Sequence, residues 1–223
     1  IKTAGQDPNN LGMVIATYNP HPGTDEALSD EQWQDVFDAV PDLAIGLLVR
    51  TNIVKKAISE VAVDWQKKVC GGTHKLTGNE ECIKDLPDTI DVDLDMFWNK
   101  THQAEMKRVV ITDMASRLAT KFGDGKIFCL SYEGMQQDVV REMRELGEFI
   151  SAPLTNTSLH DLGKVHVSHK RGSDDLSTYI KNYDELHEFI QSKNPCLIEQ
   201  LEDKGSNVHP VCGVYTGEDV ETY

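Results

Sequence analysis

The chain has few basic residues and no long apolar run. It carries 22 lysines and arginines against 37 aspartates and glutamates, a formal net charge of −15. This charge repels nucleic acid and anionic lipid, so a bound nucleotide would need a local basic site. Basic and aromatic residues do not interleave, which argues against a nucleic-acid platform. No run approaches the roughly 20 apolar residues of a membrane span.

Several motifs of catalytic and metal sites are also missing. There is no G-x-G-x-x-G, H-E-x-x-H, G-x-S-x-G or C-x-x-C. We therefore predict no metal site, although Cys70, His74 and Cys82 leave zinc as an alternative. There is no internal repeat or low-complexity tract, so the 223 residues predict a single globular domain.

Five cysteines bear on the redox environment. Cys70 and Cys82 flank a polar stretch, and Cys196 and Cys212 bracket a terminal segment, which predicts two local disulfides. Cys129 lies in the apolar run "KIFCLSY" and is predicted to be a small buried side chain.

Two glycosylation sequons agree with the cysteine pattern. They begin at Asn99 ("NKT") and Asn156 ("NTS"). Together with the paired cysteines they favour the secretory pathway, in the Golgi lumen or outside the cell. An organelle-associated assembly is the alternative.

The periodicity of apolar residues predicts an α/β fold. Strand and helix patterns alternate, which implies a parallel sheet with crossover helices and a helical C-terminal region. A cysteine-flanked acidic insertion spans 70–95. The predicted strands are 13–18, 42–49 and 126–135; the predicted helices are 28–40, 52–67, 95–122, 138–150 and 174–201, the last interrupted at Pro195.

An arginine follows one predicted strand directly. Arg50 ends the run "AIGLLVR", Thr51 and Asn52 offer a helix N-cap, and Ser59 lies in the following helix. Ligands of open α/β folds bind beyond the carboxyl ends of the strands, so Arg50 and Ser59 could share an anion there. Alternatively, Arg50 pairs with a neighbouring carboxylate and Ser59 simply occupies the helix surface.

Two segments resemble the sulfotransferase family. "VRTNIVKKAIS" is similar to its 3′-phosphate-binding segment, and "CLSYEGMQQDVVREMRELGEFI" to a later strand and helix with a tyrosine-glutamate step. The resemblance implies a P-loop-like three-layer domain that uses 3′-phosphoadenosine 5′-phosphosulfate. It also implies that Arg50 and Ser59 hold the 3′-phosphate and that Tyr132 lies near the nucleotide.

A third, basic segment fits the same family. "HKRG" resembles the family's late loop that closes over the nucleotide, with Lys170 and Arg171 supplying charge and Gly172 allowing close backbone approach. A solvated basic turn is the alternative. With this segment the resemblance covers roughly 13–172.

The chain departs from the family pattern in two respects. Arg50 and Ser59 are one residue further apart than is common, so either Thr51 fits within the turn or the serine is wrongly assigned. The family's phosphosulfate-binding loop is not found between Ile1 and Met13. We expect that loop upstream of Ile1, on a longer product.

The resemblance implies transfer of a sulfuryl group to a hydroxyl, and the secretory signals favour a carbohydrate acceptor. A general base must take the hydroxyl proton. His21 is the histidine in the expected loop, and Asp25 or Glu26 are acidic substitutes.

A different class of function stays open. The chain is alternatively a non-catalytic sulfotransferase-like subunit of a larger assembly, with its acidic surface docking a basic partner. The missing loop and the altered arginine-serine spacing motivate this hypothesis.

Overall fold

Two parallel strands organise the part of the chain that the computed structural model describes, residues 28–70, 87–151, 174–205 and 207–214. Strand β1 (Ile45–Val49) pairs with β2 (Ile127–Ser131), in register from Ile45 opposite Ile127 to Val49 opposite Ser131. The predicted parallel pairing is confirmed. The predicted strand 13–18 lies outside the described residues.

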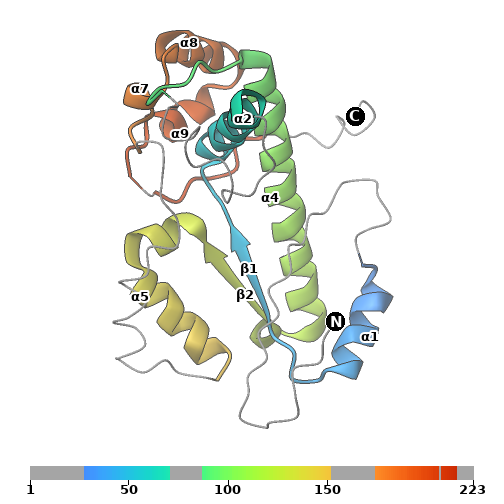
Figure 1. Cartoon of the computed structure of the whole chain (residues 1–223). Coiled ribbons are helices and arrows are strands. Elements are labelled where there is room, and N and C mark those ends of the chain that lie inside the picture. Colours follow the sequence, from blue (N-terminus) through green and yellow to red (C-terminus); the bar gives the residue numbers. More distant parts are fainter. Residues whose placement is uncertain (1–27, 71–86, 152–173, 206, 215–223) are drawn as a thin grey trace.

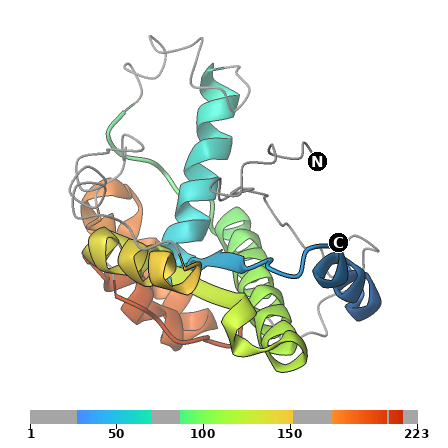
Figure 2. The same ribbon diagram turned by 90° about the horizontal axis from the view of Figure 1, so that it is seen from below.

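Helices cover both faces of this pair. Helix α4 (Leu94–Phe122) packs on one face, and α5 (Tyr132–Phe149) packs on the other, where the Phe128 and Phe149 ring centroids are 5.1 Å apart. Figures 1 and 2 show the strands between the two helices. This helix–sheet–helix layering confirms the predicted α/β architecture.

Helix α1 (Asp30–Ala39) lies within the predicted helix 28–40 and begins at a capping box. The Ser29 side chain accepts a hydrogen bond from the Gln32 N–H, and the Gln32 side chain accepts one from the Ser29 N–H at 2.8 Å. The helix packs against the end of α4 through Phe37, whose ring lies 4.4 Å from that of Phe122.

The serine cap gives a prediction about stability. We expect Ser29→Ala to lower the free energy of unfolding by about 1 kcal/mol, because the Gln32 N–H loses its acceptor at the helix end. Urea unfolding of the two proteins measures the difference. A change below about 0.3 kcal/mol would mean that the capping box does not support α1 in solution.

Helix α2 (Ile53–Cys70) follows β1 after the three residues Arg50, Thr51 and Asn52. Asn52 is its N-cap, since the side-chain oxygen accepts a hydrogen bond from the Lys55 N–H at 2.8 Å. One face of the helix is buried against α4. The buried residues are Ile53, Val54, Ala57, Ile58, Val61 and Ala62.

The helical C-terminal region is confirmed, with the break at Pro195. It contains α7 (Leu176–Tyr179), α8 (Tyr183–Lys193), the 3-10 turn η2 (Pro195–Leu197) and α9 (Ile198–Glu202); a further 3-10 turn, η1 (Asp124–Lys126), precedes β2. In Figure 1, α2, α7, α8 and α9 gather beyond the carboxyl ends of the strands. Their apolar faces form one core with the start of α4.

The polar stretch before α4 contributes to this core. Ile90 and Val92 fall within the predicted acidic insertion, yet both are buried. The Ile90 carbonyl accepts from the Lys181 N–H at 2.8 Å, and the Asn182 side chain bonds both backbone groups of Val92. The end of the insertion therefore docks the C-terminal helices.

Two predictions about β2 are corrected. The strand ends at Ser131 and α5 begins at Tyr132, before the Gly134-Met135 step, because the Ser131 side chain caps the helix by accepting from the Gly134 N–H at 2.9 Å. Cys129 is exposed and not buried. Its side chain faces a groove between β2 and α4 that small α4 residues such as Ala115 leave open.

The cysteine pairing agrees with the prediction where it can be described. Cys196 and Cys212 form a disulfide. Cys70 is also disulfide-bonded, and its predicted partner, Cys82, lies outside the described residues. Because Cys70 is bonded in this way, the alternative zinc site that needs its thiolate is wrong.

The sequence predicts no membrane-spanning segment, and the described helices bear on this prediction. None of their helices combines the length and the apolar composition needed to cross a bilayer.

Candidate functional site

The two motifs recognised in the sequence meet where the strands end. Val49 and Ser131 are the last paired residues, so Arg50 and Tyr132 leave the sheet side by side. The Arg50 guanidinium carbon lies 4.8 Å from the centroid of the Tyr132 ring, a cation–π contact. The contact between Arg50 and Tyr132 follows from the strand register.

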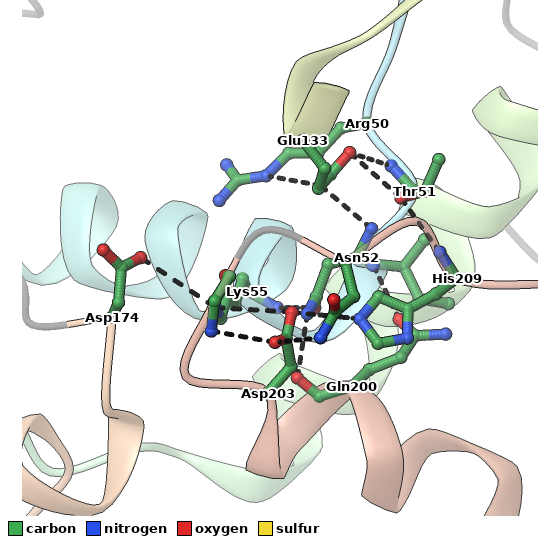
Figure 3. Close-up of polar contacts among 12 residues, drawn as sticks. Arg50, Thr51, Asn52, Lys55, Glu133, Asp174, Gln200, Asp203 and His209 are labelled. Atoms are coloured by element: carbon green, nitrogen blue, oxygen red, sulfur yellow. Dashed lines mark hydrogen bonds and ion pairs between the residues drawn. The ribbon is translucent and has the colours of Figure 1, made fainter. Parts of the chain in front are cut away.

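Glu133 anchors the turn after Arg50. Its carboxylate accepts hydrogen bonds from the Thr51 N–H at 2.9 Å, the Thr51 hydroxyl at 3.0 Å and the Asn52 N–H at 3.1 Å. Figure 3 shows these bonds converging on Glu133. A buried carboxylate is stable here because backbone donors at a helix N-terminus surround it.

The local sequence explains why Glu133 reaches this turn. Because Ser131 caps α5, the glutamate lies in the first helical turn and close to the end of β1. Gly134 follows it, and a side-chain carbon there would lie 2.7 Å from the Ser131 hydroxyl and 2.8 Å from a Glu142 carboxylate oxygen. A glycine at this position therefore allows the cap and the buried carboxylates to coexist.

Arg50 is held near Glu133 without being hydrogen-bonded to it. Its Nε atom lies 3.9 Å from a Glu133 carboxylate oxygen, and the Arg50 side chain is 26% exposed. Within the described residues, this buried Nε has no hydrogen-bond partner. The terminal nitrogens of the guanidinium point away from Glu133 in Figure 3. Arg50 can therefore donate to an anion from outside the turn.

Gln200 accepts a hydrogen bond from a further backbone amide at the N-terminus of α2. Its side-chain oxygen accepts from the Ile53 N–H at 2.8 Å, and its backbone carbonyl accepts from the Asn52 side chain at 2.9 Å. Protein acceptors thus already occupy the N–H groups of Thr51, Asn52 and Ile53. The charge that the site offers to a ligand comes from the arginine side chain, not from helix amides.

Thr51 bears on the spacing between Arg50 and Ser59. It lies in the turn, before the Asn52 cap, and its hydroxyl is bonded to Glu133. Thr51 is therefore part of the turn and not of the helix. Ser59 is exposed on α2, and its side-chain hydroxyl makes no hydrogen bond to Arg50 or to another residue that the structure describes.

The alternative for Arg50 is thus partly correct, since an ion pair with Glu133 exists. The remaining predicted site residues, His21, Lys170, Arg171 and Gly172, lie outside the described residues. The sequence singled out the tyrosine-glutamate step, but it did not identify Glu133, Asn52 or Gln200 as the groups that order the turn. Among the described residues, no cluster of histidine, cysteine and carboxylate side chains could hold a metal ion.

Comparisons with known proteins bear on the motifs that meet at the strand ends. Searches of curated proteins and of solved structures gave no significant match. The family model of the sulfotransferase domain matches residues 47–195, more than half of the 223-residue chain. That range contains Arg50, β2 and Tyr132. The chain therefore belongs to the sulfotransferase domain family.

Proposed function

We propose that this sulfotransferase domain uses 3′-phosphoadenosine 5′-phosphosulfate as its donor and binds the 3′-phosphate through Arg50. The observation that carries the proposal is the buried Nε of Arg50, which lacks a hydrogen-bond partner among the described residues. A guanidinium can offer two parallel N–H groups to a phosphate, in geometry as well as charge. Tyr132, which already stacks on Arg50, would lie near the nucleotide.

The proposed reaction transfers a sulfuryl group to a hydroxyl. The hydroxyl oxygen attacks sulfur in line, the bond from sulfur to the bridging oxygen breaks, and adenosine 3′,5′-bisphosphate leaves with the bonding electrons. Donors around the 5′-phosphosulfate stabilise the charge that develops on that oxygen. We assign the general base that takes the hydroxyl proton to His21.

The basic segment "HKRG" completes the proposed donor site. Lys170 and Arg171 would add positive charge over the nucleotide, and Gly172 would let the backbone approach it. In a chain with a net charge of −15, such a local basic site offsets the repulsion of an anionic donor.

We propose a carbohydrate hydroxyl as the acceptor and the Golgi lumen or the extracellular space as the location. The Cys196–Cys212 disulfide supports an oxidising compartment. The sequon at Asn99 places its asparagine at an exposed position of α4, where a glycan could be attached.

Ser59 is proposed as a second donor to the 3′-phosphate, from the exposed surface of α2. We expect Ser59→Ala to weaken binding of adenosine 3′,5′-bisphosphate by roughly twofold to tenfold, the scale of one neutral hydrogen bond. Affinity for adenosine 5′-monophosphate should stay the same. Ser116→Ala, at an exposed position on α4, is the matched control. An unchanged affinity for the bisphosphate would remove Ser59 from the site.

The proposed function is tested by measuring transfer of labelled sulfur from the donor to an acceptor. The full-length natural protein is incubated with donor carrying a sulfur-35 label and with a panel of carbohydrate and other hydroxyl acceptors. The proposal predicts label in an acceptor and stoichiometric release of adenosine 3′,5′-bisphosphate. Tight nucleotide binding without any transfer would contradict catalysis.

One observation favours a second candidate, a non-catalytic subunit of a larger assembly. Glu133 and Gln200 already accept from the N–H groups of Thr51, Asn52 and Ile53, so these amides at the start of α2 are closed to a ligand. In this role the acidic surface would dock a basic partner. Co-purification at fixed stoichiometry with basic chains, and no nucleotide effect on the melting temperature, would favour it over the enzyme.

A further inference from the structure

A C-terminal segment lies against the turn that carries Arg50. We define the strap as residues 207–214, whose Cys212 is joined to η2 by the disulfide with Cys196. The His209 N–H donates to the Thr51 hydroxyl at 3.2 Å, and His209 Nε2 lies 3.4 Å from the Asn52 side-chain nitrogen. In Figure 3, His209 lies beside both residues. The strap therefore contacts the turn directly.

Arg108 of α4 bridges the strap and the turn. Its guanidinium donates to the carbonyls of Thr51 at 3.0 Å, His209 at 2.6 Å and Pro210 at 3.1 Å. Burial lowers the pKa of this guanidinium, while the nearby Glu105 and Glu133 oppose that change. A charged side chain that bonds three carbonyls in this way fixes their relative positions. One of them belongs to the residue directly after Arg50.

The disulfide belongs to the same network. Gln200 donates to the Cys212 sulfur at 3.4 Å and accepts from the Ile53 N–H at 2.8 Å. The Cys212 N–H donates to Glu105, a fully buried carboxylate of α4, at 2.8 Å. The strap is thus tied to both α2 and α4.

His209 is itself held in one orientation. Its Nε2 lies 3.1 Å from a carboxylate oxygen of Asp203, and both residues are buried. Burial acts to raise the pKa of Asp203, but hydrogen bonds from His209 and the Gly205 N–H, together with the Lys55 charge, lower it overall. Asp203 is therefore an ionised acceptor for the histidine at neutral pH.

We infer that Arg108 and the strap act as positioning elements that fix Arg50 for its anionic ligand. The contacts of Arg108, His209 and Gln200 end on Thr51, Asn52 and Ile53, whose backbone sets the direction of the Arg50 side chain. Two-pronged phosphate binding tolerates errors of only about 0.5 Å and 10 to 20°. This inference rests on the proposed function.

A matched pair of arginine variants tests the inference. Arg108→Gln removes the bridge, whereas Arg117→Gln removes an exposed arginine from the same helix with the same change in net charge. We measure the Kd values of adenosine 3′,5′-bisphosphate and adenosine 5′-monophosphate. Arg108→Gln should weaken binding of the bisphosphate by roughly 5- to 20-fold and binding of the monophosphate by less than about twofold. Arg117→Gln should change neither Kd.

A double variant separates positioning from direct contact. If Arg108 acts through Arg50, then Arg50→Ala combined with Arg108→Gln should bind the bisphosphate no more weakly than Arg50→Ala alone. Additive losses would overturn the inference. Amide hydrogen exchange at Thr51, Asn52 and Ile53 should be faster in Arg108→Gln, because the turn loses its restraint.

The outcomes distinguish this inference from the proposed function. Equal wild-type affinities for the two nucleotides would overturn the proposed function, and the inference with it. A wild type that prefers the bisphosphate, with unchanged Arg108→Gln affinity, would overturn only the inference. If Arg108→Gln does not fold, His209→Ala is measured instead. This variant should lose roughly two- to fivefold in affinity for the bisphosphate and none for the monophosphate.

Discussion

Arg50→Ala is expected to weaken binding of adenosine 3′,5′-bisphosphate by roughly tenfold to a hundredfold. This corresponds to about 1.5 to 3 kcal/mol, the scale of hydrogen bonds to a charged group. The Arg50 Nε is buried without a hydrogen-bond partner among the described residues, so a bound phosphate would complete its bonding. Isothermal titration calorimetry of wild type and variant measures the change.

A second nucleotide serves as the control for this prediction. Adenosine 5′-monophosphate lacks the 3′-phosphate, so Arg50→Ala should leave its affinity within about twofold. Arg50→Lys keeps the charge but loses the planar two-pronged donor, and it should bind the bisphosphate at an intermediate affinity. Equal losses for the two nucleotides would mean that Arg50 does not contact the 3′-phosphate.

Glu133→Ala is expected to lower the free energy of unfolding by about 3 kcal/mol or more. The Thr51 N–H, the Thr51 hydroxyl and the Asn52 N–H, which lie just before the start of α2, would lose their acceptor. The cost of leaving a buried donor unsatisfied is about 1 to 3 kcal/mol, and such costs add incompletely. The Glu133 side chain is only 4% exposed, so water would replace it poorly.

Urea unfolding measures this effect against a control on the same helix. Glu145→Ala removes a carboxylate of α5 that is 54% exposed and pairs with Arg141, and it should change stability by less than about 0.5 kcal/mol. If the two variants were equally stable, the turn after β1 would not depend on Glu133.

Local patterns were sufficient to predict most of the elements. Helical periodicity predicted α1, α2 and α4, and residue type limited the N-cap of α2 to Thr51 or Asn52, of which Asn52 is the cap. A strand followed by Arg50 predicted a charged group at the carboxyl edge of the sheet. These features depend on neighbours within a few residues, so the sequence carries them directly.

The residues that order the site depend on distant contacts. Thr51 and Glu133 are 82 positions apart, and Asn52 and His209 are 157 apart. Neither pair follows from periodicity or from a cap motif. Cys129 was mispredicted for a related reason: an apolar run identifies a strand but not how fully each face is covered.

The most direct test of the central claim compares two nucleotides on the wild-type protein. Titration should show that adenosine 3′,5′-bisphosphate binds at least about tenfold more tightly than adenosine 5′-monophosphate, because the proposed Arg50 site recognises the 3′-phosphate that only the bisphosphate carries. Equal affinities, or no binding of either nucleotide to the full-length natural protein, would contradict a phosphosulfate-dependent site at the end of β1.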